Sequence, residues 1–142
     1  MRVLFDTSIL VAAMVQTHSK HEAAVAWMRK VYRDELSLLI SSHSLLECYS
    51  ILTRLPVTPR ISPNVAFQLI NDNLKKAEVI SLSPSEYASL LQECVRQNFS
   101  GGIVYDALIY KAAIIAKAQH LLTLNGKDFQ RFTLEHDFIL AA

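Results

Sequence analysis

The sequence predicts an α/β protein built on a parallel β-sheet with helices on both faces. Short apolar runs of strand length alternate with longer segments in which apolar residues recur at helical spacing. This alternation is typical of strand–helix–strand units, whose parallel strands are buried on both sides. Of the 142 residues, 51% are hydrophobic and 19% are charged, as in a globular protein with a large core. We therefore expect one domain spanning residues 1–142.

The first part of the chain contains two strand–helix units. A short apolar run predicts a strand over Arg2–Phe5, and the apolar segment Thr7–Val15 predicts a helix. Within Lys20–Tyr32, alanine, tryptophan and valine recur at helical spacing and indicate a second helix. Ser37–Ser41 predicts the next strand, and Ser44–Leu55 predicts a helix that must end before the following proline.

The second part begins with the loop segment "LPVTPRISP". Two later helices are expected to start at serines that can act as N-caps, Ser62 and Ser83, each followed by a proline at the first helical position. The other elements expected are strands over 78–82, 120–124 and 138–140, a helix over 105–118, and a short helical turn near Phe129.

Four acidic residues are expected near the carboxyl edge of this sheet, where ligands bind in such folds. Asp6 follows the first strand, Glu47 lies in the helix after the second, Asp106 opens a later helix, and Asp128 follows the fourth strand. Each acid alone has a structural explanation: the aspartates suit positive helix ends, and Ser44 with Glu47 has the spacing of a capping box.

Taken together, the four carboxylates indicate a metal site. Two such groups ~4 Å apart repel by about 4 kcal/mol at an effective dielectric constant of about 20, so either some of them are protonated or a cation holds them together. Oxygen ligands without histidine or cysteine favour Mg²⁺ or Mn²⁺ over zinc, and such ions usually act on phosphates. The neighbouring side chains that could orient water, phosphate or carboxylate oxygens are Thr7, Ser8, Thr123 and Asn125.

Three segments resemble the successive motifs of PIN-domain nucleases: "VLFDTSILV", "SSHSLLECYSILTR" and "GGIVYDALIYKAAIIAKAQHLLTLNGKDF". Their spacing is most similar to the VapC-type ribonuclease toxins of bacterial toxin–antitoxin pairs. The resemblance implies an α/β/α sandwich with a central, mostly parallel sheet flanked by helices. It also implies RNA cleavage that depends on Mg²⁺ or Mn²⁺, a homodimer, and inhibition by a cognate antitoxin.

The resemblance assigns the first three acidic positions to Asp6, Glu47 and Asp106, with Thr7 or Ser8 as the hydroxyl partner of the first. We expect Asp6 and Asp106 to form the primary metal pair. Glu47 would help to orient the attacking water or the ion.

The fourth acidic position stays open between two residues. Many relatives carry an acid where this chain has Asn125, whereas Asp128 matches another acid frequent in the same motif. A neutral residue at this position puts tight binding of a second metal in doubt. Arg54, seven positions after Glu47 on the same helix face, is the candidate for holding an RNA phosphate.

Other classes of protein fit less well. A haloacid-dehalogenase-like phosphatase would need a second aspartate where Ser8 stands, whereas a catalytically weak PIN-like module that binds RNA or protein remains an alternative. The net charge of +1 gives no general basic field, and the apolar runs are shorter than a membrane span, so we expect a cytoplasmic protein. Cys48 and Cys94 are expected to be buried free thiols.

Overall fold

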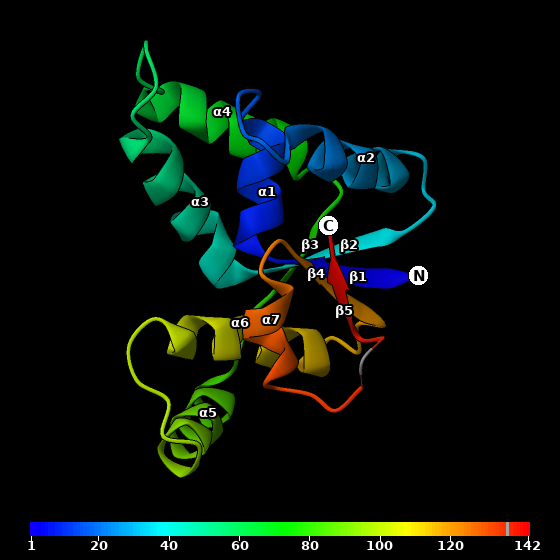
Figure 1. Cartoon of the computed structure of the whole chain (residues 1–142), viewed down its shortest axis with the longest axis vertical. Helices are drawn as coiled ribbons and strands as arrows, with labels where there is room; N and C mark the ends of the chain where they lie inside the picture. Colours follow the sequence, from blue (N-terminus) through cyan, green and yellow to red (C-terminus); the bar gives the residue numbers. More distant parts are fainter. Residues whose placement is uncertain (136) are drawn as a thin grey trace.

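The computed structural model describes residues 1–135 and 137–142, and its strands form one parallel sheet (Figure 1). The strand order is β3-β2-β1-β4-β5, and each of the four pairings in that order is parallel. The predicted parallel α/β architecture is therefore confirmed. The strands are β1 (Arg2–Phe5), β2 (Ser37–Ser41), β3 (Glu78–Ile80), β4 (His120–Thr123) and β5 (Ile139–Ala141).

Helices cover both faces of the sheet and make an α/β/α sandwich (Figure 1). One layer contains α1 (Thr7–Met14), α2 (His21–Tyr32), α3 (Ser42–Arg54) and α4 (Pro63–Asn73). The other contains α5 (Pro84–Arg96), α6 (Ile103–Ile115) and α7 (Gly126–Gln130).

Alternation along the strands separates the core into two halves. Val3 and Phe5 of β1 pack with the layer that contains α1, whereas Leu4 packs with α6 and α7 on the other face. Successive side chains of a strand point to opposite faces, so an uninterrupted apolar run is the pattern that a central strand covered on both sides requires.

Most element boundaries follow the local sequence signals. Ser62 accepts a hydrogen bond from the backbone N–H of Val65 at the start of α4, and Ser83 forms a capping box with Glu86 at the start of α5. Helices α3 and α6 each begin two residues earlier than expected, at Ser42 and Ile103. The capping-box interpretation of Ser44 and Glu47 is therefore wrong, because both residues lie inside α3.

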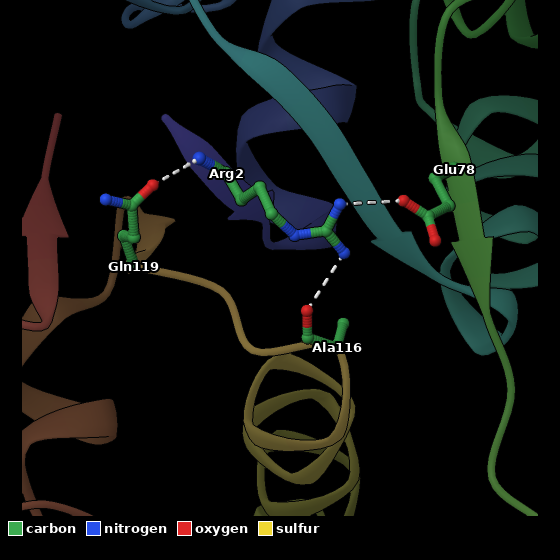
Figure 2. Close-up of polar contacts among 4 residues, drawn as sticks. All are labelled: Arg2, Glu78, Ala116 and Gln119. Carbon is green, nitrogen blue, oxygen red and sulfur yellow. Dashed lines mark hydrogen bonds and ion pairs between the residues drawn. The ribbon is translucent and has the colours of Figure 1, made fainter.

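The amino ends of the strands are joined by Arg2 (Figure 2). Its guanidinium reaches past β2 and donates to Glu78 Oε2 on β3 at 3.1 Å and to the carbonyl oxygen of Ala116, just after α6, at 2.9 Å. Its backbone N–H donates to the side-chain oxygen of Gln119 at 2.8 Å. A cation suits the end of α6, where backbone carbonyls carry partial negative charge.

Two further expectations can be compared with the structure. Cys48 and Cys94 are buried free thiols, as expected. Within residues 1–135 and 137–142, no helix is long and apolar enough to cross a membrane.

Candidate active site

Asp6 lies at the carboxyl end of β1 and is 5% exposed. Its backbone occupies the N-cap position of α1, yet its side chain makes no capping hydrogen bond. Instead, the hydroxyls of Ser8 and Thr123 each donate to Asp6 Oδ2 at 2.8 Å. The helix-capping explanation for Asp6 is therefore wrong, because its carboxylate accepts from the side-chain hydroxyls of Ser8 and Thr123 and makes no N-cap hydrogen bond.

The two hydroxyls also fix the loop that follows β4. Ser8 Oγ accepts from the backbone N–H of Leu124 at 3.1 Å, and Thr123 Oγ1 accepts from that of Asn125 at 2.9 Å. Each hydroxyl thus receives one hydrogen bond from the loop and gives one to the carboxylate. A carboxylate offers about four acceptor sites, so Asp6 keeps the capacity to bind a cation.

Helix α3 is attached to α1 by a buried pair of hydroxyls. Thr7 Oγ1 and Ser44 Oγ lie 2.8 Å apart, and both residues are buried. Ser8, not Thr7, is therefore the hydroxyl partner of Asp6. Because Ser44 lies one helical turn before Glu47, the Thr7–Ser44 contact fixes the part of α3 that carries the second acid.

Glu47 has a neighbour that the sequence motifs did not identify. His43 Nε2 lies 3.2 Å from Glu47 Oε2, and the two residues are four positions apart on α3. The His43 ring also stacks on the ring of Tyr105, with centroids 5.0 Å apart and planes inclined by 5°. These contacts connect α3 to the start of α6. The i, i+4 spacing from Glu47 is the sequence signal that would have identified His43.

Asp106 lies in the first turn of α6 and experiences the charge of the other acids. Its pKa is raised from 3.8 to about 6, first by burial and then by the negative charges of Asp6, Asp128 and Glu47, whereas the charge of Arg131 lowers it. Carboxylates affect one another's ionisation only over short distances, because solvent screens longer ones. The fold thus gathers acids that are separated by as many as 122 residues in the chain.

Two buried groups respond to the same negative charge. Burial raises the pKa of Asp6, the hydrogen bonds from Thr123 and Ser8 lower it, and Glu47 raises it further. The pKa of the Cys48 thiol is raised to about 12, mainly by burial and then by Glu47 and Asp6. For Asp6, Cys48 and Asp106, on three different elements, the charges of neighbouring acids add to the larger effect of burial.

The two candidates for the fourth position have different surroundings. Asn125 is exposed and its side chain does not cap α7. Asp128, on α7, raises the pKa of Asp106 and pairs with Arg131, whose Nη2 lies 3.6 Å from Asp128 Oδ1. Asp128 is thus the candidate whose charge reaches Asp106. Arg131 was not identified from the motifs, although its i, i+3 spacing from Asp128 is a signal for an ion pair.

The donor set fits a hard divalent cation, with one restriction. Asp6, Asp106 and Glu47 supply carboxylate oxygens, and the raised pKa values of the two aspartates are what a site that lacks positive charge produces. In the part of the chain described, no three acidic, histidine or cysteine side chains lie close enough to share one ion. An ion held by two carboxylates and several waters is the arrangement typical of Mg²⁺.

Arg54 lies away from these contacts. It is the last residue of α3 and is exposed, two helical turns beyond Glu47. At the C-terminal end of the helix, its positive charge interacts favourably with the helix dipole.

Comparison with known proteins gives consistent matches along the chain. The PIN domain family matches residues 3–134. Ribonuclease VapC40 of Mycobacterium tuberculosis is 34% identical over 137 residues, which cover 94% of this chain and 96% of that protein. Ribonuclease VapC27 of the same species is 34% identical over 123 residues, which cover 87% of this chain and 82% of that protein.

A solved structure has the same fold. The crystal structure of VapBC2 from Rickettsia felis, bound to a DNA fragment from their promoter, superposes with a TM-score of 0.67. The superposition covers 100% of this chain and 98% of that chain, at 21% sequence identity.

Proposed function

The chain belongs to the PIN-domain family, among relatives named VapC ribonucleases, and we propose that it is the ribonuclease toxin of a toxin–antitoxin pair. PIN-domain ribonucleases generally use a divalent metal ion, and we propose Mg²⁺ or Mn²⁺ for this chain. The observation that carries the proposal is that Asp6, Asp128 and Glu47 lie near enough to Asp106 to add to the rise in its pKa that burial causes. Such a concentration of negative charge serves to bind a cation that in turn binds a phosphate.

Each acid has a proposed role in phosphodiester hydrolysis. Asp6 and Asp106 would hold the ion, with Asp6 oriented by the hydroxyls of Ser8 and Thr123. When bound, the ion supplies positive charge to the phosphate and lowers the pKa of a water. Glu47, held by His43, would orient that water and accept its proton as its oxygen bonds to phosphorus and the bond to the leaving oxygen breaks.

Three other residues have outer roles in the proposal. Asp128 would complete the acidic site next to Asp106, and Asn125 would hold a water at the exposed start of α7. The buried hydroxyl of Thr7 supports Glu47 through Ser44.

The proposal is tested by cleavage of a single-stranded RNA in EDTA and after addition of Mg²⁺ or Mn²⁺. Asp106→Asn should abolish the metal-dependent cleavage. Asp72→Asn is the matched control, because Asp72 lies on the surface of α4 and pairs there with Lys75. Cleavage that survives Asp106→Asn, or its absence with every metal, would leave the alternative of a PIN-like module that only binds RNA or protein.

Arg54 is proposed to contact the RNA and not the ion. Arg54→Ala should weaken RNA binding while leaving the affinity for the metal unchanged, because the guanidinium is two helical turns from Glu47. The two affinities are measured separately, by fluorescence anisotropy of labelled RNA and by calorimetric titration with Mn²⁺. An unchanged RNA affinity would remove Arg54 from the proposal.

A cognate antitoxin is proposed as the protein partner. An inhibitory segment that covers the acids needs positive charge, since Asp6, Glu47 and Asp106 are matched by few cations. Two exposed apolar residues in the same helix layer as Glu47, Leu46 on α3 and Phe67 on α4, support an apolar contact with the partner. In a bacterial host, expression should be toxic, and Asp6→Asn or co-expression of the partner should relieve the toxicity.

The homodimer also stays a proposal. Leu91 and Val95 on α5 are 68% and 81% exposed, and they support an apolar contact with a second copy. Sedimentation velocity of the wild type and of Val95→Glu tests it: the wild type should be a dimer and the variant a monomer.

A further inference from the structure

A pocket of about 360 Å³ lies between α5, α6 and the segment after α7. It contains none of the site residues expected from the sequence. Ala107, which follows Asp106 in α6, is part of its wall. The other side chains that the argument uses are Arg96, Phe99, Tyr110, Lys111, Arg131 and Phe132.

Positive charge predominates around this pocket. Arg96, Lys111 and Arg131 line it together with one acid, Glu93. The pKa of Glu93 is lowered mainly by its hydrogen bond from Arg96 and further by the charge of Lys111. Arg96 pairs with Glu93, whereas Arg131 makes a longer contact of 3.6 Å with Asp128 through one nitrogen. Lys111 and the other N–H groups of Arg131 therefore remain available for an anion. In a chain with a net charge of +1, this is a local concentration of positive charge.

Arg131 connects the pocket to the acids. Its guanidinium lines the pocket, lies 3.6 Å from Asp128 and lowers the pKa of Asp106. An RNA strand whose scissile phosphate lies at Asp106 would therefore pass Arg131 as it enters the pocket. Arginine suits this position, because its planar guanidinium can donate two hydrogen bonds to one phosphate.

Aromatic rings form the apolar wall of the pocket. The rings of Tyr110 and Phe132 stack with centroids 5.4 Å apart, and Phe99 meets Phe132 edge to face at 5.5 Å. All three side chains are partly exposed. A partly exposed aromatic wall next to cations is the combination that binds single-stranded nucleic acid, since bases stack on rings and phosphates pair with cations.

We propose that this pocket binds a nucleotide of the RNA substrate that flanks the cleaved bond. Arg131 and Lys111 hold its phosphate, and its base packs on the wall formed by Tyr110 and Phe132. This inference rests on the proposed ribonuclease function.

The test measures RNA binding without catalysis. A fluorescein-labelled oligouridylate is titrated in EDTA at several salt concentrations with the wild type and with Lys111→Gln/Arg131→Gln. Each lost phosphate contact lowers the slope of log affinity against log salt by about 0.7 for a single strand, so the double variant should lower it by about 1.4. Arg131→Lys, which retains the charge, should restore about half of this loss when Lys111→Gln is kept.

The matched control is Lys30→Gln/Arg33→Gln, which removes the same two charges from the region of α2, in the opposite helix layer (Figure 1). Its salt slope should equal that of the wild type. The inference is overturned if Lys111→Gln/Arg131→Gln keeps the wild-type salt slope. It is also overturned if the control variant lowers the salt slope as much as the pocket variant does.

A second measurement tests the aromatic wall. The fluorescence of 2-aminopurine, placed next to the cleavage site in the oligouridylate, should be quenched by the wild type and by Tyr110→Phe but less by Tyr110→Leu. Equal quenching by all three proteins overturns the stacking contact.

The inference and the proposed function fail in different ways. Metal-dependent cleavage by the wild type, with an unaltered salt slope in the pocket variant, refutes the pocket and supports the ribonuclease. Pocket-dependent RNA binding without cleavage in any metal supports the pocket and refutes the ribonuclease.

Discussion

Charges are paired at one end of the parallel sheet and gathered with the same sign at the other. At the amino ends, Arg2 pairs with Glu78 and with a carbonyl at the end of α6, so the charges there are matched (Figure 2). At the carboxyl ends, Asp6, Glu47 and Asp106 are gathered with the same sign, and burial raises the pKa of both aspartates. The matched charges at the amino ends favour stability, whereas the gathered like charges at the carboxyl ends oppose it; we propose that a bound cation offsets them.

The largest expected effect separates activity from stability at Asp6. Asp6→Asn keeps an oxygen that can accept from Ser8 and Thr123, but it removes a charge that the fold disfavours. Cleavage should fall at least about a hundredfold, because metal ions supply several kcal/mol of transition-state stabilisation. The melting temperature of the metal-free protein should stay equal or rise.

Asp6→Asn is checked by cleavage rates and by thermal unfolding in EDTA. A variant that loses activity and unfolds at a lower temperature would contradict the contrast between the two ends. It would mean that the Asp6 charge stabilises the fold.

The next effect concerns the hydroxyl that holds Asp6 in position. Thr123→Val removes the donor to Asp6 and the acceptor for the N–H of Asn125 at a fully buried position. Loss of a buried partner costs about 1–3 kcal/mol of unfolding free energy, which urea denaturation measures.

Thr53→Val is the matched control for Thr123→Val. The Thr53 hydroxyl bonds the carbonyl oxygen of Tyr49 within α3, and its loss should change stability by less than about 0.5 kcal/mol. Equal losses of unfolding free energy in the two variants would show that the Thr123 hydroxyl contributes no more to stability than the Thr53 hydroxyl.

A smaller effect is expected from pH. Folding raises the pKa of Asp106 from 3.8 to about 6, so between these values the folded protein binds more protons than the unfolded chain. Stability from this group is therefore fully present below pH 3.8 and is lost as the pH rises through about 6. In EDTA, the melting temperature of the wild type should fall relative to that of Asp106→Asn by about 3–5 °C across this range.

The pH effect has its own control. Saturating Mg²⁺ should restore the melting temperature of the wild type above pH 6, since a bound cation favours the ionised carboxylate and stabilises the folded state by mass action. If the difference in melting temperature between the wild type and Asp106→Asn did not change with pH, it would contradict the negative charge assigned to the carboxyl ends of the strands.

The smallest effect is expected at the amino ends. Glu78→Gln removes one charge of a partly exposed ion pair, and such pairs contribute about 0–1 kcal/mol. The rate of RNA cleavage should not change, because Arg2 and Glu78 lie at the end of the sheet away from the acids. A decrease in cleavage after Glu78→Gln would show that the two ends are coupled.

The sequence predicted the layers and the edge of the sheet that carries the acids, because both depend on local patterns. Apolar runs such as Val3–Phe5 predict buried strands, and capping serines such as Ser83 predict helix starts. Once the strands are parallel, residues that follow them lie at one edge, which places Asp6 there. The expectation that Asp106, at the start of α6, lies near the same edge rested also on the family motif, and the metal pair of Asp6 and Asp106 stays a prediction.

Side-chain partners could not be predicted in the same way. Thr7 and Ser8 are adjacent hydroxyls, and the direction in which α1 leaves the sheet decides that Ser8 contacts Asp6 while Thr7 contacts Ser44. Neither Arg131 nor the stacking of His43 on Tyr105 follows from a motif, since these contacts depend on how α3, α6 and α7 pack. Local sequence patterns determine the helices and strands, whereas packing between them determines which side chains contact one another.

The thiol next to Glu47 has a consequence for the choice of metal and for oxidative stress. With its pKa raised to about 12, Cys48 is un-ionised at neutral pH, and only an ionised sulfur competes for zinc or copper or reacts with peroxide. Burial, with smaller contributions from the charges of Glu47 and Asp6, thus keeps this thiol in its unreactive form. We therefore expect Cys48 to resist oxidation by peroxide in the folded protein.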